Sequence, residues 1–279
     1  MSNLKRILAL PAALWLVVAS GTVISTARAA ETVEIYSAGS LRGVVGELAK
    51  EAGPALGIEV KSSFGGSGLM RERIEKGETP DLFLSADVGS PRKLAAAGRT
   101  IVPAIAFARN RMCIMSRSSA GVTATNVIDR LLAKGVRLKT SIPVADPAGD
   151  YAWAIFDRID ALRPGSGAPL KSKAQDSMSL EATPTTPTQS AAAALFLTNK
   201  VDMSITYCSA APSLENEVPG LTSLVVPPKL DPHPLYGAAV LSNKPQALRL
   251  ALFLLSDKGQ AIIAREGLVP LAEAPTPPQ

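Results

Sequence analysis

The 279-residue sequence predicts an α/β protein made of two doubly wound lobes that are joined by hinge strands. Short runs rich in β-branched residues alternate with helical patterns, which is typical of a mostly parallel sheet with helices on its faces. Two further runs are extended, apolar and bounded by prolines, as expected for segments that cross between lobes. Roughly 250 residues remain after an N-terminal leader, and a chain of that length usually divides into two domains.

In the first lobe, each expected strand leads directly into an expected helix. The helix that begins at Leu41 carries apolar residues at spacings of three and four, a single buried stripe. The helix from Leu69 has Ser67 before it and Gly77 after it as expected caps. The expected strands are Val33–Ala38, Ile58–Phe64 and Asp81–Ala86, with helices from Leu41, from Leu69 and near Pro91.

A second α/β unit is expected between the two crossing segments, which follow Pro103 and occupy Leu221–Pro228. The stretch Arg163–Pro187, rich in Pro, Ser, Thr and Gly, is expected to be a loop with at most a short strand. The remaining expected elements are strands Arg111–Ser116, Ile142–Ala145 and Met203–Tyr207, a helix around Asn126–Lys134, a helix carrying Tyr151 to Leu162, and a final strand Tyr236–Leu241 before a helix that opens at Pro245.

Two crossings make the first lobe discontinuous, because both ends of the mature chain contribute to it. We expect lobe 1 at residues 31–109 and 228–273, with lobe 2 inserted at residues 110–227. The Pro-rich tail at residues 274–279 is expected to be disordered.

The first 30 residues have the pattern of a cleaved secretory signal. Lys5 and Arg6 precede an apolar run, and small residues end it at Ala27 to Ala30. A membrane anchor is the alternative, although the apolar run is short for a bilayer span. Three positive charges lie in this leader, so the formal charge falls from +5 to about +2 in the mature chain. An exported, periplasmic protein is therefore expected.

Composition argues against several function classes. Basic residues are scattered and aromatic residues are few, so nucleic-acid binding has little support. The single histidine, His233, lies between prolines, and no catalytic triad forms around it. Cys113 and Cys208 lack zinc-ligand spacing. In an oxidising compartment they form either a disulfide or two buried thiols. We therefore expect neither an enzyme nor a cofactor or metal site.

Four helix starts share one design, in which a strand leads into small, hydroxyl or glycine residues and then into a helix. The backbone N–H groups of a helix start are unpaired and attract anions. One such start alone is more often an ordinary cap, whereas four from two lobes indicate an anion site. They are Ser37-Ala38-Gly39-Ser40, Phe64-Gly65-Gly66-Ser67-Gly68, Asp146-Pro147-Ala148-Gly149-Asp150 and Thr185-Thr186-Pro187-Thr188-Gln189.

From about Val33 to Pro270 the chain resembles the periplasmic molybdate-binding proteins of ABC transporters, which have the type 2 periplasmic-binding fold. The resemblance depends on the first two helix starts and on further motifs in the family's order. These are Pro80-Asp-Leu-Phe-Leu-Ser-Ala-Asp87, Phe107-Ala-Arg-Asn-Arg111, Pro147-Ala-Gly-Asp-Tyr-Ala152, Ile205-Thr-Tyr207 and Phe253-Leu-Leu-Ser-Asp-Lys-Gly-Gln260.

The resemblance implies a monomer that binds molybdate, or tungstate, between its lobes and delivers it to a membrane permease. Neutral donors would hold the ligand: the hydroxyls of Ser40, Ser67 and Tyr207, and the backbone amides of Ala148 and Gln189. Alternatives are another small anion (sulfate, phosphate or an organic acid), ferric iron, and a secreted enzyme that uses Ser40 or Ser67 as nucleophile.

The sequence departs from the family at two of these places. Asp146 and Asp150 flank the amide of Ala148, and Gln189 stands where an apolar residue is usual. The two carboxylates either cap the helix or contact the ligand, and capping is the expectation.

Overall fold

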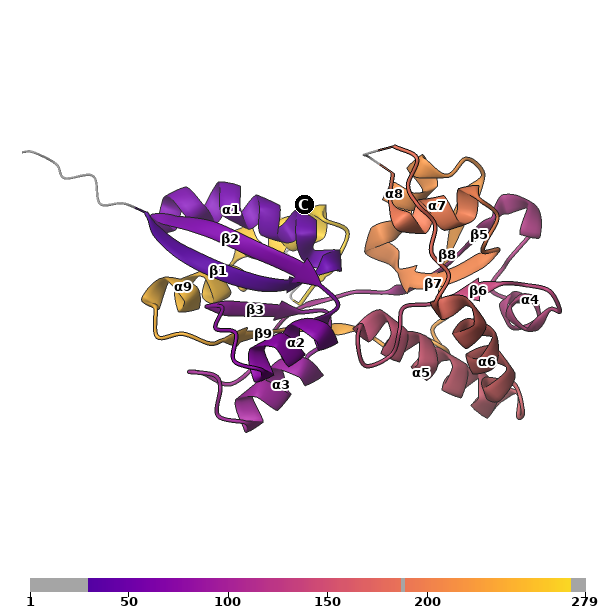
Figure 1. The fold of residues 1–279 in the computed structure, drawn as a ribbon, viewed down its shortest axis with the longest axis horizontal. Helices are drawn as coiled ribbons and strands as arrows, with labels where there is room; N and C mark the ends of the chain where they lie inside the picture. Colours follow the sequence, from indigo (N-terminus) through magenta and orange to yellow (C-terminus); the bar gives the residue numbers. More distant parts are fainter. Residues whose placement is uncertain (1–29, 187–188, 272–279) are drawn as a thin grey trace, which may run out of the picture.

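The computed structural model describes residues 30–186 and 189–271 and has two lobes joined by extended segments (Figure 1). Residues 1–29 of the expected leader and the tail at residues 274–279 lie outside the described residues. Among the helices that are described, none is long and apolar enough to cross a membrane.

The first lobe is built around a six-stranded sheet of order β10-β4-β9-β3-β1-β2. β1 runs parallel to β2 and β3, whereas β9 is antiparallel to both of its neighbours, β3 and β4, and β10 is antiparallel to β4. The expectation of a mostly parallel sheet was therefore wrong. The strands are β1 (Glu31–Ala38), β2 (Ile58–Gly65), β3 (Leu82–Ser85), β4 (Ile105–Arg109), β9 (Leu235–Val240) and β10 (Val269–Pro270).

The second lobe contains a four-stranded sheet of order β6-β7-β5-β8. β5 is antiparallel to β7 and β8, and β6 is parallel to β7. Alternate residues of β5 pack on opposite faces, so that Ile114 joins one hydrophobic cluster and Met115 the other. The strands are β5 (Met112–Arg117), β6 (Leu138–Lys139), β7 (Met203–Tyr207) and β8 (Leu221–Val225).

Helices cover both faces of each sheet, as the predicted doubly wound fold requires (Figure 1). In the first lobe, the stripe Leu41, Val44, Val45 and Leu48 is buried against the sheet. The first-lobe helices are α1 (Arg42–Leu56), α2 (Ser67–Glu75), α3 (Gly89–Ala96), α9 (Pro245–Phe253) and α10 (Asp257–Arg265). The second-lobe helices are α4 (Val127–Leu132), α5 (Pro147–Leu162), α6 (Gly167–Met178), α7 (Ala191–Leu197) and α8 (Ala211–Glu217).

The chain crosses between the sheets twice, at residues 110–111 between β4 and β5 and at residues 226–234 between β8 and β9. The first sheet is thus assembled from segments on both sides of the second. Asn110 ties the two crossings together, because its backbone N–H donates to Pro234 O at 3.1 Å.

Three expected elements differ from the structure. The expected crossing Leu221–Pro228 begins with β8 of the second sheet, so the chain crosses only after Val225. Ile142–Ala145 is a turn and not a strand, since Pro143 cannot donate to a ladder and Val144 has a φ of 69°. The expected loop Arg163–Pro187 contains α6, whose buried residues Leu170, Ala174 and Ser177 recur at helical spacing. Pro169 lies in the first turn of α6, where a helix tolerates it.

Candidate functional site

A cavity of about 360 Å³ lies between the lobes, at the ends of β1, β2 and β7 and at the start of α5. We call it the inter-lobe cavity. Among the described residues that line it, Asp146 is the single side chain with a charge at neutral pH, and no Lys, Arg or His contributes. The lining residues are Ala38, Gly39, Ser40, Gly65, Gly66 and Ala86 from lobe 1, and Ser141, Asp146, Ala148, Thr206, Tyr207 and Ala210 from lobe 2.

Ser40 is held at the cavity by Tyr236 on β9. β1 ends at Ala38, and a short 3₁₀ turn, Gly39–Leu41, then carries Ser40 to the cavity. The Ser40 Oγ lies 3.1 Å from the Tyr236 hydroxyl, which accepts a hydrogen bond from Asn110 Nδ2 at 3.0 Å. Because the phenol accepts from Asn110, its own proton can go to Ser40 Oγ. The Ser40 proton then remains free to be donated to a ligand.

Tyr207, the last residue of β7, has its hydroxyl buried without a hydrogen-bond partner among the described residues. Its ring packs against the rings of Tyr151 and Tyr236, with centroids 6.3 and 5.6 Å away. Burial raises the pKa of Tyr207 well above its usual value, and burial likewise raises the pKa of Tyr236. Both phenols therefore stay protonated at neutral pH and act as neutral donors.

Ser67 is fully buried beneath the inter-lobe cavity and is not among the residues that line it. Its Oγ accepts a hydrogen bond from the backbone N–H of Ala86 at 3.0 Å, which ties the start of α2 to the end of β3. The cap of α2 is Gly66 and not Ser67 as the sequence suggested. Gly66, which precedes Ser67, and Ala86, which donates to it, do line the cavity.

Asp146 caps α5, as expected. Its Oδ1 accepts from the backbone N–H of Ala148 at 3.0 Å, so the amide expected to bind a ligand already has a partner. Asp150 accepts from the N–H of Val144 at 2.9 Å and does not line the inter-lobe cavity. Burial raises the pKa of Asp150, and the nearby carboxylates Asp87 and Asp146 add to this effect.

The structure brings Ser40, Ala148 and Tyr207 to one cavity, with Ser67 just beneath, but does not bring Gln189 there. The side chain of Gln189 turns back on its own segment, where Oε1 accepts from the N–H of Thr185 at 2.6 Å. The helix expected to start at Gln189 begins two residues later, at Ala191, because Ser190 Oγ caps α7 by accepting from Ala193 N at 3.1 Å.

Gly66 and Gly68 allow the two lobes to touch through their backbones. A β-carbon on Gly68 would lie 1.7 Å from Val144 O, and one on Gly66 would lie 2.4 Å from Ala145 O. The N–H of Leu69 donates to Ala145 O at 3.3 Å across the same contact. The missing side chains of these two glycines thus make room for the turn of the other lobe. Val144 in that turn has a positive φ, which is costly for a β-branched residue.

The two cysteines form a disulfide, which decides between the two alternatives left open by the sequence. Cys113 is on β5, as expected, whereas Cys208 lies in the 3₁₀ turn Cys208–Ala210 directly after β7 and not in a strand. The bond fixes the end of β7, and with it Tyr207, to the neighbouring strand.

Sequence reasoning missed Tyr236 and Asn110, which support Ser40 from the hinge side. A tyrosine within the small apolar run Tyr236–Val240 was the available signal, because a buried phenol needs a hydrogen-bond partner. Within residues 30–186 and 189–271, no group of three or more His, Cys, Asp or Glu side chains could hold a metal ion. His233 is exposed and lies beside Asp231.

The arrangement can bind an anion through neutral donors at an interface between two lobes. Hydroxyl protons of Ser40 and Tyr207 come from opposite lobes, so a ligand that accepts from both favours a closed arrangement of the lobes.

Comparison with known proteins identifies the family. The model of a family described as bacterial extracellular solute-binding protein matches residues 33–269. An uncharacterized protein of Pasteurella multocida is 34% identical over 242 residues, which are 85% of this chain and 98% of that protein.

Solved structures with low sequence identity share the fold. The periplasmic molybdate-binding protein of Azotobacter vinelandii is 18% identical, with a TM-score of 0.64 over 86% of this chain and 100% of that chain. The sulfate-binding protein of Mycobacterium tuberculosis is 17% identical, with a TM-score of 0.67 over 86% of this chain and 87% of that chain. The predicted type 2 periplasmic-binding fold is confirmed. Because the family match extends over most of the sequence, the chain belongs to the bacterial extracellular solute-binding proteins.

Proposed function

We propose that this solute-binding protein captures a tetrahedral oxyanion in the inter-lobe cavity and delivers it in the periplasm to the permease of an ABC importer. Molybdate is the proposed ligand, with tungstate as its nearest substitute. The observation that carries the proposal is the buried hydroxyl of Tyr207, which has no hydrogen-bond partner among the described residues and lies at a cavity bounded by both lobes. A buried polar group without a partner is costly, and a ligand that accepts its proton removes this cost.

The chemistry of the lining favours an anion that is held without counter-charge. Ser40 and Tyr207 offer hydroxyl protons, and a buried dianion needs several such preorganised donors to replace its hydration shell. The lining of the inter-lobe cavity is less suited to ferric iron, because iron binds tyrosine as the phenolate and burial raises the pKa of Tyr207 and Tyr236. A serine nucleophile would need a base near Ser40, and its described partner is the neutral phenol of Tyr236.

Closure explains how binding would be signalled to a permease. The ligand bridges lobes that are joined at residues 110–111 and 226–234, so occupancy shifts the population toward the closed form. A permease that docks on both lobes would then distinguish loaded from empty protein. Molybdate-binding and sulfate-binding proteins are both among the structures that share this fold, so size selection within the cavity decides between those anions.

Calorimetric titration of the purified protein with molybdate, tungstate, sulfate, phosphate and ferric citrate tests the proposal. Sub-micromolar binding of molybdate and tungstate alone is expected. Binding of sulfate, phosphate or ferric iron in their place would overturn the choice of ligand while leaving the family unchanged.

Substitutions test the place of binding. Tyr207→Phe and Ser40→Ala should each weaken binding by about 5- to 150-fold, which corresponds to about 1–3 kcal/mol per lost donor. Tyr36→Phe is the matched control, because Tyr36 also loses a hydroxyl but pairs with Arg73 and Glu78 away from the cavity. Unchanged affinity in both site variants would show that the ligand binds elsewhere.

A further inference from the structure

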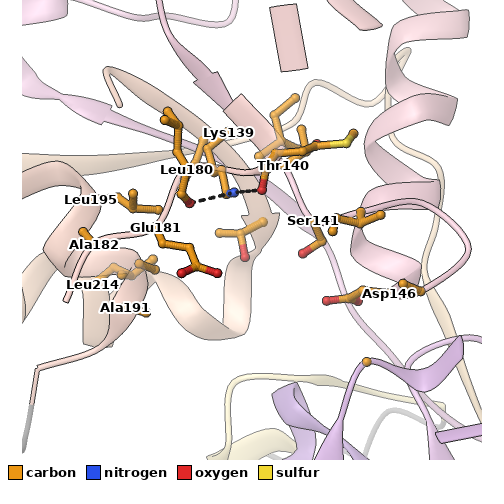
Figure 2. A pocket seen from close by; sticks show the side chains of 18 of the residues that line it. Lys139, Thr140, Ser141, Asp146, Leu180, Glu181, Ala182, Ala191, Leu195 and Leu214 are labelled. Carbon is orange, nitrogen blue, oxygen red and sulfur yellow. Dashed lines mark hydrogen bonds between the residues drawn. The ribbon is translucent and has the colours of Figure 1, made fainter. Parts of the chain in front are cut away.

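A second and larger cavity, of about 600 Å³, lies next to the inter-lobe cavity. Figure 2 shows the side chains that line it. We call it the lobe-2 cavity. The two cavities share four lining residues, Gly66, Ser141, Asp146 and Thr206, so they adjoin each other.

Closure of the lobes cannot fill the lobe-2 cavity, because nearly all of its walls belong to a single lobe. Gly66 and Leu69 are its lining residues from the first lobe. The rest come from β6, the segment between β6 and α5, the end of α6 and the segment after it, α7, β7 and α8. Most of this surface is apolar, with Ile142, Met178, Leu180, Leu195, Ile205 and Leu214 among the contributors.

If the ligand were an oxyanion without a substituent, the lobe-2 cavity would be filled with water. At about 30 Å³ per molecule, the cavity holds roughly 20 waters against walls that offer them few hydrogen bonds. An apolar group that displaced this water would gain free energy in proportion to the apolar area it covers. The cavity is therefore better suited to part of a ligand than to solvent.

The charged groups around the lobe-2 cavity limit the charge that a ligand group bound there can carry. Lys139 Nζ donates to the backbone oxygens of Ser177, Met178 and Leu180 at 2.9, 2.6 and 3.3 Å, so all three of its protons already make hydrogen bonds. Asp146 and Glu181 add carboxylates to the wall, which repel a second anionic group. An uncharged group fits best.

Within the described part of the chain, one buried polar group of the wall lacks a hydrogen-bond partner. Thr140 is 2% exposed, and its Oγ1 has no hydrogen bond within the described part of the chain. Because Thr140 lines the cavity, this hydroxyl can pair with a single polar atom on an otherwise apolar group.

We propose that the protein binds organic oxyanions, namely phosphonates or sulfonates whose tetrahedral head lies in the inter-lobe cavity and whose uncharged, mainly apolar substituent lies in the lobe-2 cavity. The inference rests on the proposed function, since the head uses the same donors, Ser40 and Tyr207. It extends the ligand class from bare oxyanions to substituted ones.

Titration with a series of alkylphosphonates tests this assignment, with molybdate as the reference ligand. Each added methylene should tighten binding about fourfold, the equivalent of about 0.8 kcal/mol, so that butylphosphonate binds roughly 50-fold more tightly than methylphosphonate. Phenylphosphonate should also exceed methylphosphonate.

A substitution that fills the lobe-2 cavity provides the second measurement. Ala192, an exposed helical residue of α7, lines the cavity, and leucine preserves helix propensity there. Ala192→Leu should weaken butylphosphonate binding at least tenfold and leave methylphosphonate and molybdate unchanged. Ala96→Leu is the matched control, because Ala96 is an exposed helical residue of α3 that lines neither cavity.

The outcomes separate the two proposals. Affinity that does not rise with chain length overturns the inference, as does equal weakening of methyl- and butylphosphonate by Ala192→Leu. Molybdate binding without any phosphonate binding overturns the inference and leaves the proposed function standing. A chain-length gain without molybdate binding supports the inference and overturns the choice of molybdate. Binding of no oxyanion at all overturns both.

Discussion

Tyr236 and Tyr207 are neighbouring phenols with opposite roles. Tyr236 is paired with Asn110 and Ser40, whereas the hydroxyl of Tyr207 has no partner among the described residues. A buried hydroxyl that makes hydrogen bonds contributes to stability, whereas one without a partner destabilises the ligand-free protein. The two residues should therefore respond differently to the same substitution.

Tyr236→Phe should lower both stability and oxyanion affinity. It leaves one Asn110 N–H without its acceptor, at a cost of about 1–3 kcal/mol in unfolding free energy. It also frees Ser40 to rotate away from the inter-lobe cavity. Urea unfolding and calorimetric titration check both effects. Tyr207→Phe is the comparison, because it should lose affinity without losing stability. A Tyr236→Phe protein with wild-type affinity would show that Tyr236 does not position Ser40.

Asp146 combines a stabilising role with a repulsive one. Asn caps helices about as well as Asp, so Asp146→Asn should keep the bond to Ala148 N while it removes the negative charge of the inter-lobe cavity. We expect roughly fivefold tighter binding of a dianion, from a charge interaction of order 1 kcal/mol. Titration at low and high salt checks this, because the gain should shrink with ionic strength. Weaker binding would mean that the carboxylate contacts the ligand directly.

At the scale of elements, an ionic cluster ties α2 to β1. Glu78 accepts from Arg73 Nη2 at 2.6 Å and from the Tyr36 hydroxyl, and the Arg73 guanidinium lies 4.4 Å from the centre of the Tyr36 ring. The hydrogen bond from Arg73, and after it the one from Tyr36, lowers the pKa of Glu78 from 4.5 to about 2.

This cluster makes a prediction about acid stability. A carboxyl with a lowered pKa stabilises the fold above its unfolded pKa, and that contribution disappears as the pH falls from 4.5 to about 2. Glu78→Gln should therefore be less stable than wild type at pH 7, and the difference should vanish near pH 2. Urea unfolding of both proteins at several pH values measures it. A difference that does not change with pH would show that the ionised carboxylate is not the cause.

The sequence predicted those elements whose signal is local. The helix starts that contain Ser40 and Ala148 were recognised from small residues just before a helix, although a turn and not the expected strand precedes Ala148. The family resemblance, and not the local pattern, implied that these two residues bind the ligand. Prediction failed where a local signal was misleading. The proline-rich composition of the segment suggested a loop where α6 forms. Ser190 caps α7, so this helix starts after Gln189 and not at it. The direction of β9 cannot be read locally, since an apolar strand has the same pattern in either direction. The bond between Asn110 and Tyr236 joins residues 126 positions apart.

At the scale of the whole molecule, the disulfide constrains lobe 2 alone. It joins residues 95 positions apart, so it removes much conformational freedom from the unfolded chain. Replacing both Cys113 and Cys208 by serine should lower the unfolding free energy by about 2–5 kcal/mol, as measured by urea unfolding. Wild type in reductant should show the same loss, and the double variant should not respond to reductant. Equal stability of the two proteins would contradict the prediction.

The position of β9 has a consequence for the order of folding. β9 lies between β3 and β4, at the centre of the first sheet, yet it comes from residues 235–240, beyond the whole of lobe 2. The chain is synthesised from its N-terminus, so β3 and β4 are made before β9. Until β9 is made, the strand edges that it will cover stay unpaired, and such edges are prone to pair with other chains. Lobe 2 has all its strands in one uninterrupted stretch and can mature first. The half of the protein that is made first is thus completed last.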